Sequence, residues 1–486
     1  MLAKKEDVML TIILESGRKI PLYEQIYQHI KHEIKEGTLP PNTKLPSTRS
    51  LSDNLSVSRN TVDLAYSQLV SEGYIESRPK SGYYVCLVAD LSNIILKNPP
   101  ITKADKEEKA NYLYDFSPFT IDIYNFPYHT WKRLSKEAMS VTNHELFLLG
   151  CNQGDENLRV AIGEYLRSFR SVNCNTDQII VGAGSDYLLQ LLCQLLTIDN
   201  IDNNSVIAME NPTYMRAYHI FKGFSYKVEP IALDKYGIHI ESLTKSKANI
   251  VYVTPSHQYP LGIVMPITRR LELLNWANEA PNRYIIEDDH DSEFRYKGKP
   301  IPSLQGTDSD GKVIYLGTFS RALTPALRIA YMVLPDKLFK LYKDNFSYYS
   351  STVSRVDQHI LAEFIMGGYF ERHLNKMRKI YKSKHDLLIQ LLKIFGDKIE
   401  IEGENAGLHL VLRFHTKLSE EEIIKIASKH HIKLYGLSKH YIVPSQPSNL
   451  LDEYSRPTFL LGYANISEEV LRNGILCLYE ALKDIL

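Results

Sequence analysis

The chain has 486 residues, with 57 lysines and arginines against 57 aspartates and glutamates, so its formal net charge is zero. That length is too great for one ordinary domain and predicts two or three. A neutral chain has no overall positive field, so binding to nucleic acid would require a local basic patch. No apolar run reaches the roughly 18 residues of a membrane span. The five cysteines have no metal or redox spacing, so we expect a reduced, cytoplasmic protein.

The N-terminal part has the pattern of a small helical domain with a β-hairpin. Apolar spacing predicts helices over residues 21–37, 45–55 and 58–73. Residues 74–85 alternate around a Pro-Lys-Ser-Gly turn and predict a two-stranded hairpin. Three helices followed by a two-stranded wing are typical of a winged helix-turn-helix domain, which we place at residues 15–86. The predicted apolar stripe of the third helix consists of Val62, Ala65, Tyr66, Leu69 and Val70.

The third helix would enter the DNA major groove with its N-terminal residues forward. Ser58 suits the N-cap position, and the residues after it can donate hydrogen bonds to phosphates or base edges. Basic residues on the second helix and on the wing would add contacts to the DNA backbone. A helical module for protein contacts is the alternative interpretation of the same pattern. The predicted DNA-binding residues are Arg49, Ser58, Arg59, Asn60, Thr61, Arg78 and Lys80.

A segment that is charged, contains proline and is poor in apolar residues follows the hairpin. Residues 96–111 read LKNPPITKADKEEKAN, a composition typical of a linker. We place the linker at residues 87–111 and a second domain at residues 112–486.

Five apolar runs in the second domain each end in small or polar residues. Helical stretches separate most of them, which predicts an α/β domain with a mostly parallel sheet. Polar residues at the carboxyl ends of parallel strands usually line a ligand crevice. The runs cover residues 178–185, 205–214, 249–258, 284–291 and 313–321. The side chains expected at this crevice are Ser185, Tyr214, His257, Asp288, His290, Ser320 and Arg328.

The chemistry of these side chains suits one cofactor. The strand-to-helix turn at Gly184–Ser185 offers backbone N–H groups and a hydroxyl to a phosphate, and Ser320 and Arg328 could hold the same group. Asp288 could pair with a protonated ring nitrogen, and Tyr214 could stack on a flat ring. A phosphate, an aromatic ring and a ring N–H together describe pyridoxal phosphate.

Both halves also resemble known families. The stretch LPSTRSLSDNLSVSRNTVDLAYSQLVSEGYIESRPKSGYYV looks like a GntR-type winged helix, which implies DNA binding. The second domain resembles the fold-type I aminotransferases in stretches such as TPSHQYPLGIVMPITRR, EDDHDSEFRY and GTFSRALTPALRIAY. This resemblance implies a smaller C-terminal α/β subdomain beside the mostly parallel sheet. Together the two halves resemble the MocR subgroup of GntR regulators over nearly the whole chain. This resemblance implies a homodimer that binds double-stranded operator DNA and a small effector.

The resemblance also implies roles for individual residues of the second domain. Asp288 matches the partner of the pyridine nitrogen, Tyr214 the stacking aromatic, and Arg328 a phosphate ligand. Arg216 matches an arginine on the substrate side. An arginine near the stretch FLLGYAN usually binds the ligand carboxylate in this family, and Arg456 is the nearest candidate.

The departures from the family pattern concern its chemistry. Arg321 occupies the position of the Schiff-base lysine, and His290 stands where a tyrosine usually contacts the ring hydroxyl. Asp186 follows the phosphate-turn serine, where an uncharged residue is usual. A guanidinium, with a pKa above about 12, stays protonated and can neither form an imine nor shuttle a proton. The predicted cofactor-binding residues are Gly184, Ser185, Tyr214, Asp288, His290, Ser320, Arg321 and Arg328.

The run EDDHDSE at residues 287–293 is dense in carboxylates around a histidine. Oxygen ligands of this kind could bind a divalent cation. The spacing follows no EF-hand or zinc pattern, so the sequence predicts one inward-facing carboxylate, Asp288, and no metal site.

We expect a transcription regulator whose second domain dimerises and senses a small anionic or amino-acid-like effector. Pyridoxal phosphate would bind that domain without a covalent bond, or the domain would have lost the cofactor. An active pyridoxal-phosphate-dependent aminotransferase is the alternative: Asp288, Tyr214 and Arg328 favour it, and Arg321 opposes it.

Overall fold

The computed structural model of the chain describes residues 10–15, 20–87, 112–199, 205–296, 301–443 and 456–486. The chain divides into two compact units, Met1–Lys109 and Ala110–Leu486. Apart from Leu87, the predicted linker at 87–111 lies outside the described residues. Among those residues, no helix has both the length and the apolar character needed to span a bilayer.

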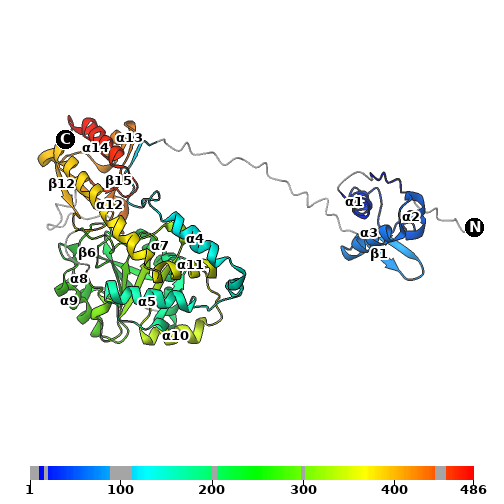
Figure 1. Cartoon of the computed structure of the whole chain (residues 1–486), viewed down its shortest axis with the longest axis horizontal. Coiled ribbons are helices and arrows are strands. Elements are labelled where there is room, and N and C mark those ends of the chain that lie inside the picture. Colours follow the sequence, from blue (N-terminus) through cyan, green and yellow to red (C-terminus); the bar gives the residue numbers. More distant parts are fainter. Residues whose placement is uncertain (1–9, 16–19, 88–111, 200–204, 297–300, 444–455) are drawn as a thin grey trace, which may run out of the picture. The chain divides into compact units, whose positions relative to one another are not determined.

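The first unit contains three helices and a hairpin (Figure 1). The Ser47 hydroxyl accepts the N–H of Ser50 at the start of α2, and the Ser58 hydroxyl accepts the N–H of Thr61 at the start of α3. Such side-chain caps satisfy backbone donors that have no partner within the helix. The predicted winged helix-turn-helix is therefore confirmed. Its elements are α1 (Leu22–Lys35), α2 (Thr48–Leu55), α3 (Arg59–Ser71), β1 (Ile75–Arg78) and β2 (Gly82–Val85).

The core of the first unit joins one face of α1 to one face of α3. Ile26 and Ile30 of α1 are fully buried with Tyr66 of α3 in the same cluster. The predicted stripe of α3 is confirmed except at Val70, which is 38% exposed. An α-helix turns by about 100° per residue, so Val70 lies well to one side of the buried Leu69.

An eight-stranded sheet forms the centre of the second unit, in the order β4-β11-β10-β9-β8-β5-β6-β7. Strands β5, β6, β8, β9 and β10 are parallel. Strand β11 pairs antiparallel with both β4 and β10, so β4 shares the direction of the parallel strands. The strands are β4 (Ile179–Gly182), β5 (Val206–Asn211), β6 (Lys227–Asp234), β7 (Gly237–Ile238), β8 (Ile250–Val253), β9 (Tyr284–Asp289), β10 (Val313–Thr318) and β11 (Ala330–Val333).

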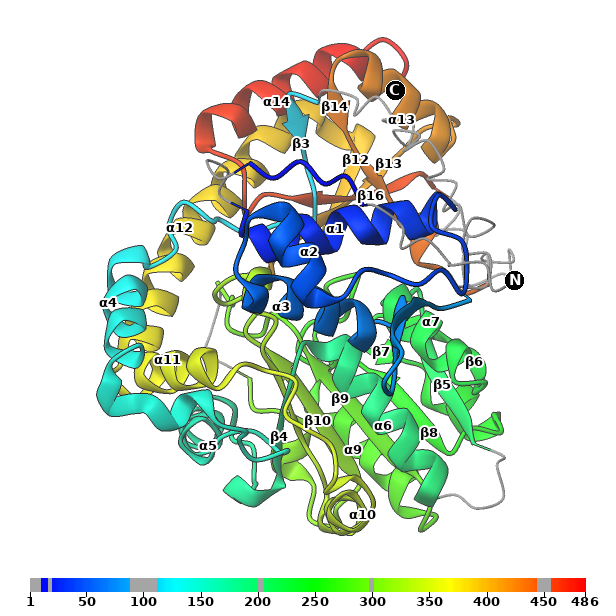
Figure 2. The same cartoon turned by 90° about the vertical axis from the view of Figure 1, so that its right-hand side faces the viewer.

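Helices cover both faces of this sheet, whose strands follow one another across Figure 2 from β4 to β6. Alternate residues of a strand point to opposite faces, and both faces are apolar here. In β5, Met209 packs in the cluster of α6 (Ser185–Asp199), α7 (Met215–Gly223) and α10 (Asp336–Phe346). Its neighbour Ala208 packs in the cluster of α8 (Ile240–Lys245) and α9 (Ile267–Asn278). The predicted α/β class, with a mostly parallel sheet, is confirmed.

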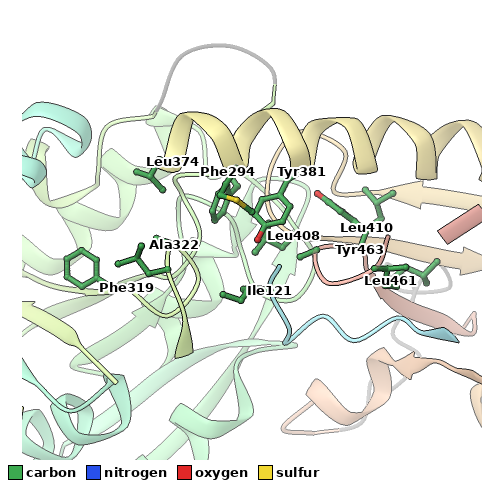
Figure 3. Packing of buried hydrophobic residues seen from close by; sticks show 14 of the residues in the cluster. Ile121, Phe294, Phe319, Ala322, Leu374, Tyr381, Leu408, Leu410, Leu461 and Tyr463 are labelled. Carbon is green, nitrogen blue, oxygen red and sulfur yellow. The ribbon is translucent and has the colours of Figure 1, made fainter. Parts of the chain in front are cut away.

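A smaller antiparallel sheet, in the order β12-β13-β16-β15, follows in the chain. Long helix α12 joins it to the large sheet: Leu374 and Tyr381 on α12 lie in one cluster with Phe294, Leu410 and Leu461 (Figure 3). Its elements are α12 (Tyr369–Leu392), β12 (Ile399–Glu402), β13 (His409–Phe414), α13 (Glu420–Lys429), β15 (Tyr435–Gly436), the 3-10 helix η7 (Leu437–His440), β16 (Thr458–Gly462) and α14 (Glu468–Leu482).

The second unit also contains three further helices and a pair of short strands. They are α4 (Tyr128–Ala138), α5 (Glu156–Arg170) and α11 (Arg355–Met366), with β3 (Tyr114–Asp115) parallel to β14 (Ile432–Lys433).

Candidate functional site

A cavity of about 350 Å³ lies at the carboxyl ends of the parallel strands. The loops that follow β5, β8 and β10, the end of β9 and the start of α6 all contribute to its wall. The lining residues are Phe119, Ser185, Tyr214, Met215, Arg216, Tyr252, Thr254, Tyr259, Asp288, His290, Thr318, Ser320, Arg321, Pro325, Arg328 and His440.

Asp288, near the end of β9, is a buried carboxylate in the cavity wall. The hydroxyl of Tyr252, in β8, donates a hydrogen bond to it. Burial raises the pKa of Asp288 to about 6; the bond from Tyr252 opposes that shift, and repulsion from Asp289, Asp291 and Asp186 adds to it. A carboxylate with this pKa is mostly ionised at pH 7 and suits a cationic ring N–H.

A buried ion pair fixes the end of β9 on the side away from Asp288. Arg170 Nε lies 2.8 Å from Asp289 Oδ2, and Arg170 Nη2 donates to Ser256 Oγ at 2.6 Å. The hydroxyl of Tyr315, in β10, also donates to Asp289 Oδ2, at 2.5 Å. These bonds connect the end of β9 to the loop after β8 and to β10. The backbone next to Asp288 is therefore fixed in position.

The start of α6 forms a corner rich in charge. Ser185 is the first residue of α6, where free backbone N–H groups favour an anion. Arg216 Nη1 and Arg328 Nη2 each lie 3.2 Å from Asp186 Oδ2. The carboxylate of Asp186 therefore already pairs with the two arginines that line this part of the cavity.

Gly184 allows the guanidinium of Arg328 to approach the helix start. Its φ of +88° is a left-handed conformation, and a Cβ atom at this position would lie 2.5 Å from Arg328 Nη2. Arg328 Nη2 also donates to the carbonyl of Ala183 at 3.2 Å. A side chain at position 184 would thus be strained in itself and would displace the arginine.

Arg321, three residues after β10, is half-buried in the cavity wall. Its Nη1 donates to the carbonyl of Pro118 at 2.9 Å. No carboxylate of the described ranges lies within ion-pair distance of Arg321, and no lysine from those ranges lines the cavity. The positive charge of Arg321 acts on Tyr259 and Tyr214, whose pKa values are raised mainly by burial and lowered somewhat by this arginine.

Pyridoxal phosphate, the cofactor predicted from the sequence, fits this cavity in part. Asp288 is placed for a ring nitrogen, and Tyr214 stands in the wall with its ring at 89° to that of Tyr259. Ser185 and Ser320 offer hydroxyls for a phosphate, and the hydroxyl of Thr318 donates to that of Ser320 at 2.9 Å. The phosphate corner fits less well than the ring side, because Asp186 brings a negative charge to it.

Histidines form the wall next to Asp288. His290 lines the cavity, and His257 and Asp291 lie behind it, both buried. Burial lowers the pKa of His290, and burial also lowers the pKa of His409 to about 3. His409 Nε2 donates to the carbonyl of Pro260 at 2.8 Å. These two imidazoles are therefore neutral at pH 7.

The structure brings together most of the residues predicted for this site. Gly184 and Asp186 adjoin the cavity, and His257 lies behind its wall. Arg456, the predicted carboxylate ligand, is exposed and is not one of the lining residues. Its predicted position depended on a nearby motif, and the chain before it, residues 444–455, lies outside the described residues. The predicted residues that line the cavity are Ser185, Tyr214, Arg216, Asp288, His290, Ser320, Arg321 and Arg328.

Several lining residues were not predicted from the sequence. Tyr252 is the one hydroxyl in the apolar strand IVYV, a signal that could have been recognised. Tyr259 and Thr254 follow the same strand, within a run whose His257 was selected instead. His440 comes from η7 in the distant small-sheet region, and no local pattern in the sequence indicates it.

The predicted DNA-binding residues lie on the surface of the first unit. Thr61 is half-buried, and its hydroxyl lies 2.7 Å from that of Ser58, so these two side chains bond to each other. Arg59 has only a long contact with Asp63, 3.7 Å from Nε to Oδ2. Arg78 pairs with Glu76 at 2.5 Å. The exposed members of the set are Arg49, Ser58, Arg59, Asn60, Arg78 and Lys80.

Two family models match the chain. Residues 22–85 match the bacterial regulatory proteins of the gntR family, and residues 119–468 match the class I and II aminotransferases. The first match spans the winged helix-turn-helix, and the second includes every residue that lines the cavity.

Similar proteins share both parts. The HTH-type transcriptional regulator YdeL of Bacillus subtilis is 40% identical over 478 residues, covering 98% of this chain and 99% of that protein. The probable rhizopine catabolism regulatory protein MocR of Rhizobium meliloti is 32% identical, covering 96% of this chain and 94% of that protein. The multiple substrate aminotransferase of Thermococcus profundus superimposes with a TM-score of 0.66 at 24% identity, covering 78% of this chain and 92% of that one. This last likeness shows the fold alone.

Proposed function

The chain belongs to the MocR subgroup of GntR-family transcription regulators, and we propose that its aminotransferase-like domain is a ligand sensor without transaminase activity. The observation that supports this most directly is the presence of Arg321 in the cavity wall, where no lysine of the described residues stands. A guanidinium remains protonated and has no free lone pair, so it cannot form the covalent imine that transamination needs.

Arg321 takes the place of the Schiff-base lysine in this proposal. Its position supports the assignment, because it follows β10 and lines the same cavity as Asp288 and Tyr214. Pyridoxal phosphate would then bind without a covalent bond, or another small anion would bind in its place.

The effector is a small molecule with an anionic group, such as an amino acid or a phosphorylated ring. Three arginines line the cavity, and Asp186 pairs with only two of them, Arg216 and Arg328. Arg321 therefore remains as a donor for a carboxylate or phosphate. Across the cavity wall, Asp288 would receive a cationic nitrogen of the same ligand.

The first unit binds operator DNA through the N-terminus of α3 and through the wing. Arg59 and Asn60 are exposed in the first turn of α3, where a recognition helix meets base edges. Arg49, Arg78 and Lys80 would contact phosphates. The hydrogen bonds between Ser58 and Thr61 would stabilise the first turn of α3.

A homodimer forms through the aminotransferase-like domain in this proposal. Exposed apolar side chains gather in the segment after α4: Val141 and Leu149 are each 90% exposed, and Phe147 and Leu148 exceed 60%. Isolated monomers rarely expose such a cluster, and a second copy would bury it.

An electrophoretic shift assay with the DNA upstream of the protein's own gene tests the regulatory function. Specific retardation by the full-length chain, changed in extent by a bound effector, is expected. Absence of specific retardation with and without candidate amino acids and pyridoxal phosphate would overturn the proposal. Amino-acid-dependent transamination by the wild-type chain would revive the alternative, an active aminotransferase.

A further inference from the structure

Three metal-ligating side chains converge behind the cavity wall. His257 comes from the loop after β8, whereas His290 and Asp291 are the two residues that follow β9, so sequence spacing alone does not bring the three together. One potential ligand atom from each lies within 4.8 Å of the other two. The side chains of His257 and Asp291 are only 1% and 3% exposed.

One carboxylate oxygen lies between two imidazole nitrogens in this group. His257 Nδ1 lies 3.1 Å from Asp291 Oδ1, and His290 Nε2 lies 3.3 Å from the same oxygen. Ligand atoms bound at about 2.0–2.2 Å to a tetrahedral ion are separated by roughly 3.3–3.5 Å. Both distances are therefore close to those of atoms that share one metal ion.

Two ring nitrogens of this group make no hydrogen bond in the described structure. His257 Nε2 and His290 Nε2 are buried, and neither makes a hydrogen bond there. Leaving a buried polar atom without a hydrogen-bond partner is unfavourable. His290 Nε2 lies within ion-pair distance of Asp291 Oδ1 but makes no hydrogen bond, so a cation between these two atoms would contact both.

We propose that His257, His290 and Asp291 bind a divalent first-row transition ion, such as Zn²⁺ or Co²⁺. Two imidazoles and one carboxylate are ligands that such ions prefer, whereas Mg²⁺ and Ca²⁺ prefer oxygen atoms alone. His290 lines the cavity, so an ion at this site can take a further ligand from the effector.

Metal titration of the full-length, chelator-treated chain tests the site. Calorimetry with Zn²⁺, and the visible absorption of Co²⁺, should report one bound ion that His290→Tyr removes or weakens by at least about tenfold. The matched control is His219→Tyr, which makes the same substitution on the exposed face of α7. Binding by Mg²⁺ should be absent at this site, and near-ultraviolet circular dichroism should show that each variant is folded.

The absorption of bound Co²⁺ separates this site from the free cysteines. Thiolate ligands give intense charge-transfer bands, which a site of nitrogen and oxygen ligands lacks. The proposal fails if wild type and His290→Tyr bind the same number of ions with equal affinity; His257 and Asp291 would then form only a hydrogen-bonded pair. If His290→Tyr does not fold, His290→Gln and Asp291→Asn replace it in the same titration. The inference does not rest on the regulatory function, and the DNA shift assay reports on that function separately.

Discussion

Arg328 Nη2 lies 3.2 Å from Asp186 Oδ2, so the residue predicted to bind a phosphate is already paired with a carboxylate of its own chain. Arg216 Nη1 contacts the same oxygen at 3.2 Å. An incoming anion must therefore compete with Asp186 for both arginines and is repelled by its charge. We therefore expect Asp186 to weaken phosphate binding at this corner.

Asp186→Asn should strengthen the binding of pyridoxal phosphate and of inorganic phosphate. Removing one negative charge next to the anion should raise affinity roughly tenfold, about 1.4 kcal/mol, with some screening because Asp186 is partly exposed. Calorimetric titration with each ligand measures the change. Glu421→Gln removes an equal charge from the exposed first turn of α13 and should leave both affinities as they are. Equal or weaker binding by Asp186→Asn would contradict this account of the corner.

Arg321→Lys should restore part of the covalent reaction with pyridoxal phosphate. A lysine in this half-buried position can lose its proton and form an imine, which an arginine cannot. After borohydride treatment, intact-mass measurement should find a pyridoxyl adduct on the variant and none at this position in wild type. Recovery should be partial because Asp186 and His290 remain. Arg283→Lys, at the end of the loop before β9, controls for added lysine. An adduct of equal yield in wild type would show that another lysine reaches the cavity.

Ligands with a cationic ring nitrogen should bind more weakly as the pH falls through 6. The pKa of Asp288 is raised by burial to about 6, so its carboxylate loses its charge on acidification through that pH. Between pH 7 and pH 5 the ionised fraction falls roughly tenfold, and affinity should follow it. Asp288→Asn should remove this part of the pH dependence while keeping any part due to the ligand's phosphate. An unchanged profile in Asp288→Asn would exclude Asp288 as the partner.

The raised pKa of Asp288 affects stability in the direction opposite to its effect on ligand affinity: acidification weakens ligand binding but favours the folded state. The folded state holds the Asp288 proton more tightly than the unfolded chain does, so the group favours folding below its unfolded pKa. That contribution is lost as the pH rises through about 6.

Tyr252→Phe removes the hydrogen bond that opposes the rise in the pKa of Asp288 and should move the midpoint of the ligand-binding profile to higher pH.

Arg59→Ala should weaken binding to operator DNA by about 1–3 kcal/mol, which is roughly fivefold to 150-fold. Its guanidinium is exposed in the first turn of α3 and has only a long contact with Asp63. Fluorescence anisotropy at one fixed salt concentration measures the loss. Lys35→Ala removes the same charge from the far end of α1 and should change the affinity little. If both variants bind operator DNA with the same affinity, the N-terminus of α3 does not contact the DNA bases.

Leu149→Asp should shift the protein from dimer to monomer. Leu149 and Val141 are each 90% exposed, and a charge among them would be buried unpaired in an interface. Sedimentation velocity over a range of concentrations measures the shift. Ile267→Asp, at an exposed apolar residue of α9, should leave the assembly unchanged. A wild-type chain that is monomeric at all concentrations would remove the basis of this prediction.

Local patterns predicted the elements whose signals are local. Ser58 caps α3 as its residue type indicated, and the strands that lead into the cavity end where polar residues replace apolar ones. Strand β11 was not predicted, because its four residues AYMV are short and the strand returns antiparallel between β4 and β10. A short apolar run does not reveal its direction; the sheet determines it.

The sequence predicted which residues line the cavity, but it did not predict which of their side chains contact one another. Spacing placed Asp288, Tyr214 and Arg328 at one edge of the sheet, and the structure brings them to one cavity. No spacing rule could show that Asp186 holds two arginines, or that His257 and Asp291 meet across 34 residues of sequence. Such contacts depend on side-chain direction after the strands have assembled.

The cavity wall comes from two parts of the second unit: Asp288 stands in the large sheet, whereas His440 comes from η7, beside the small one. The backbone N–H of Thr213 donates to the carbonyl of His440 at 2.9 Å, which is a direct link between the two parts. A ligand that contacts both Asp288 and His440 would form a second link between the two parts, in addition to this hydrogen bond. By thermodynamic reciprocity, anything that separates the two parts must loosen the ligand by the same factor by which the ligand resists their separation.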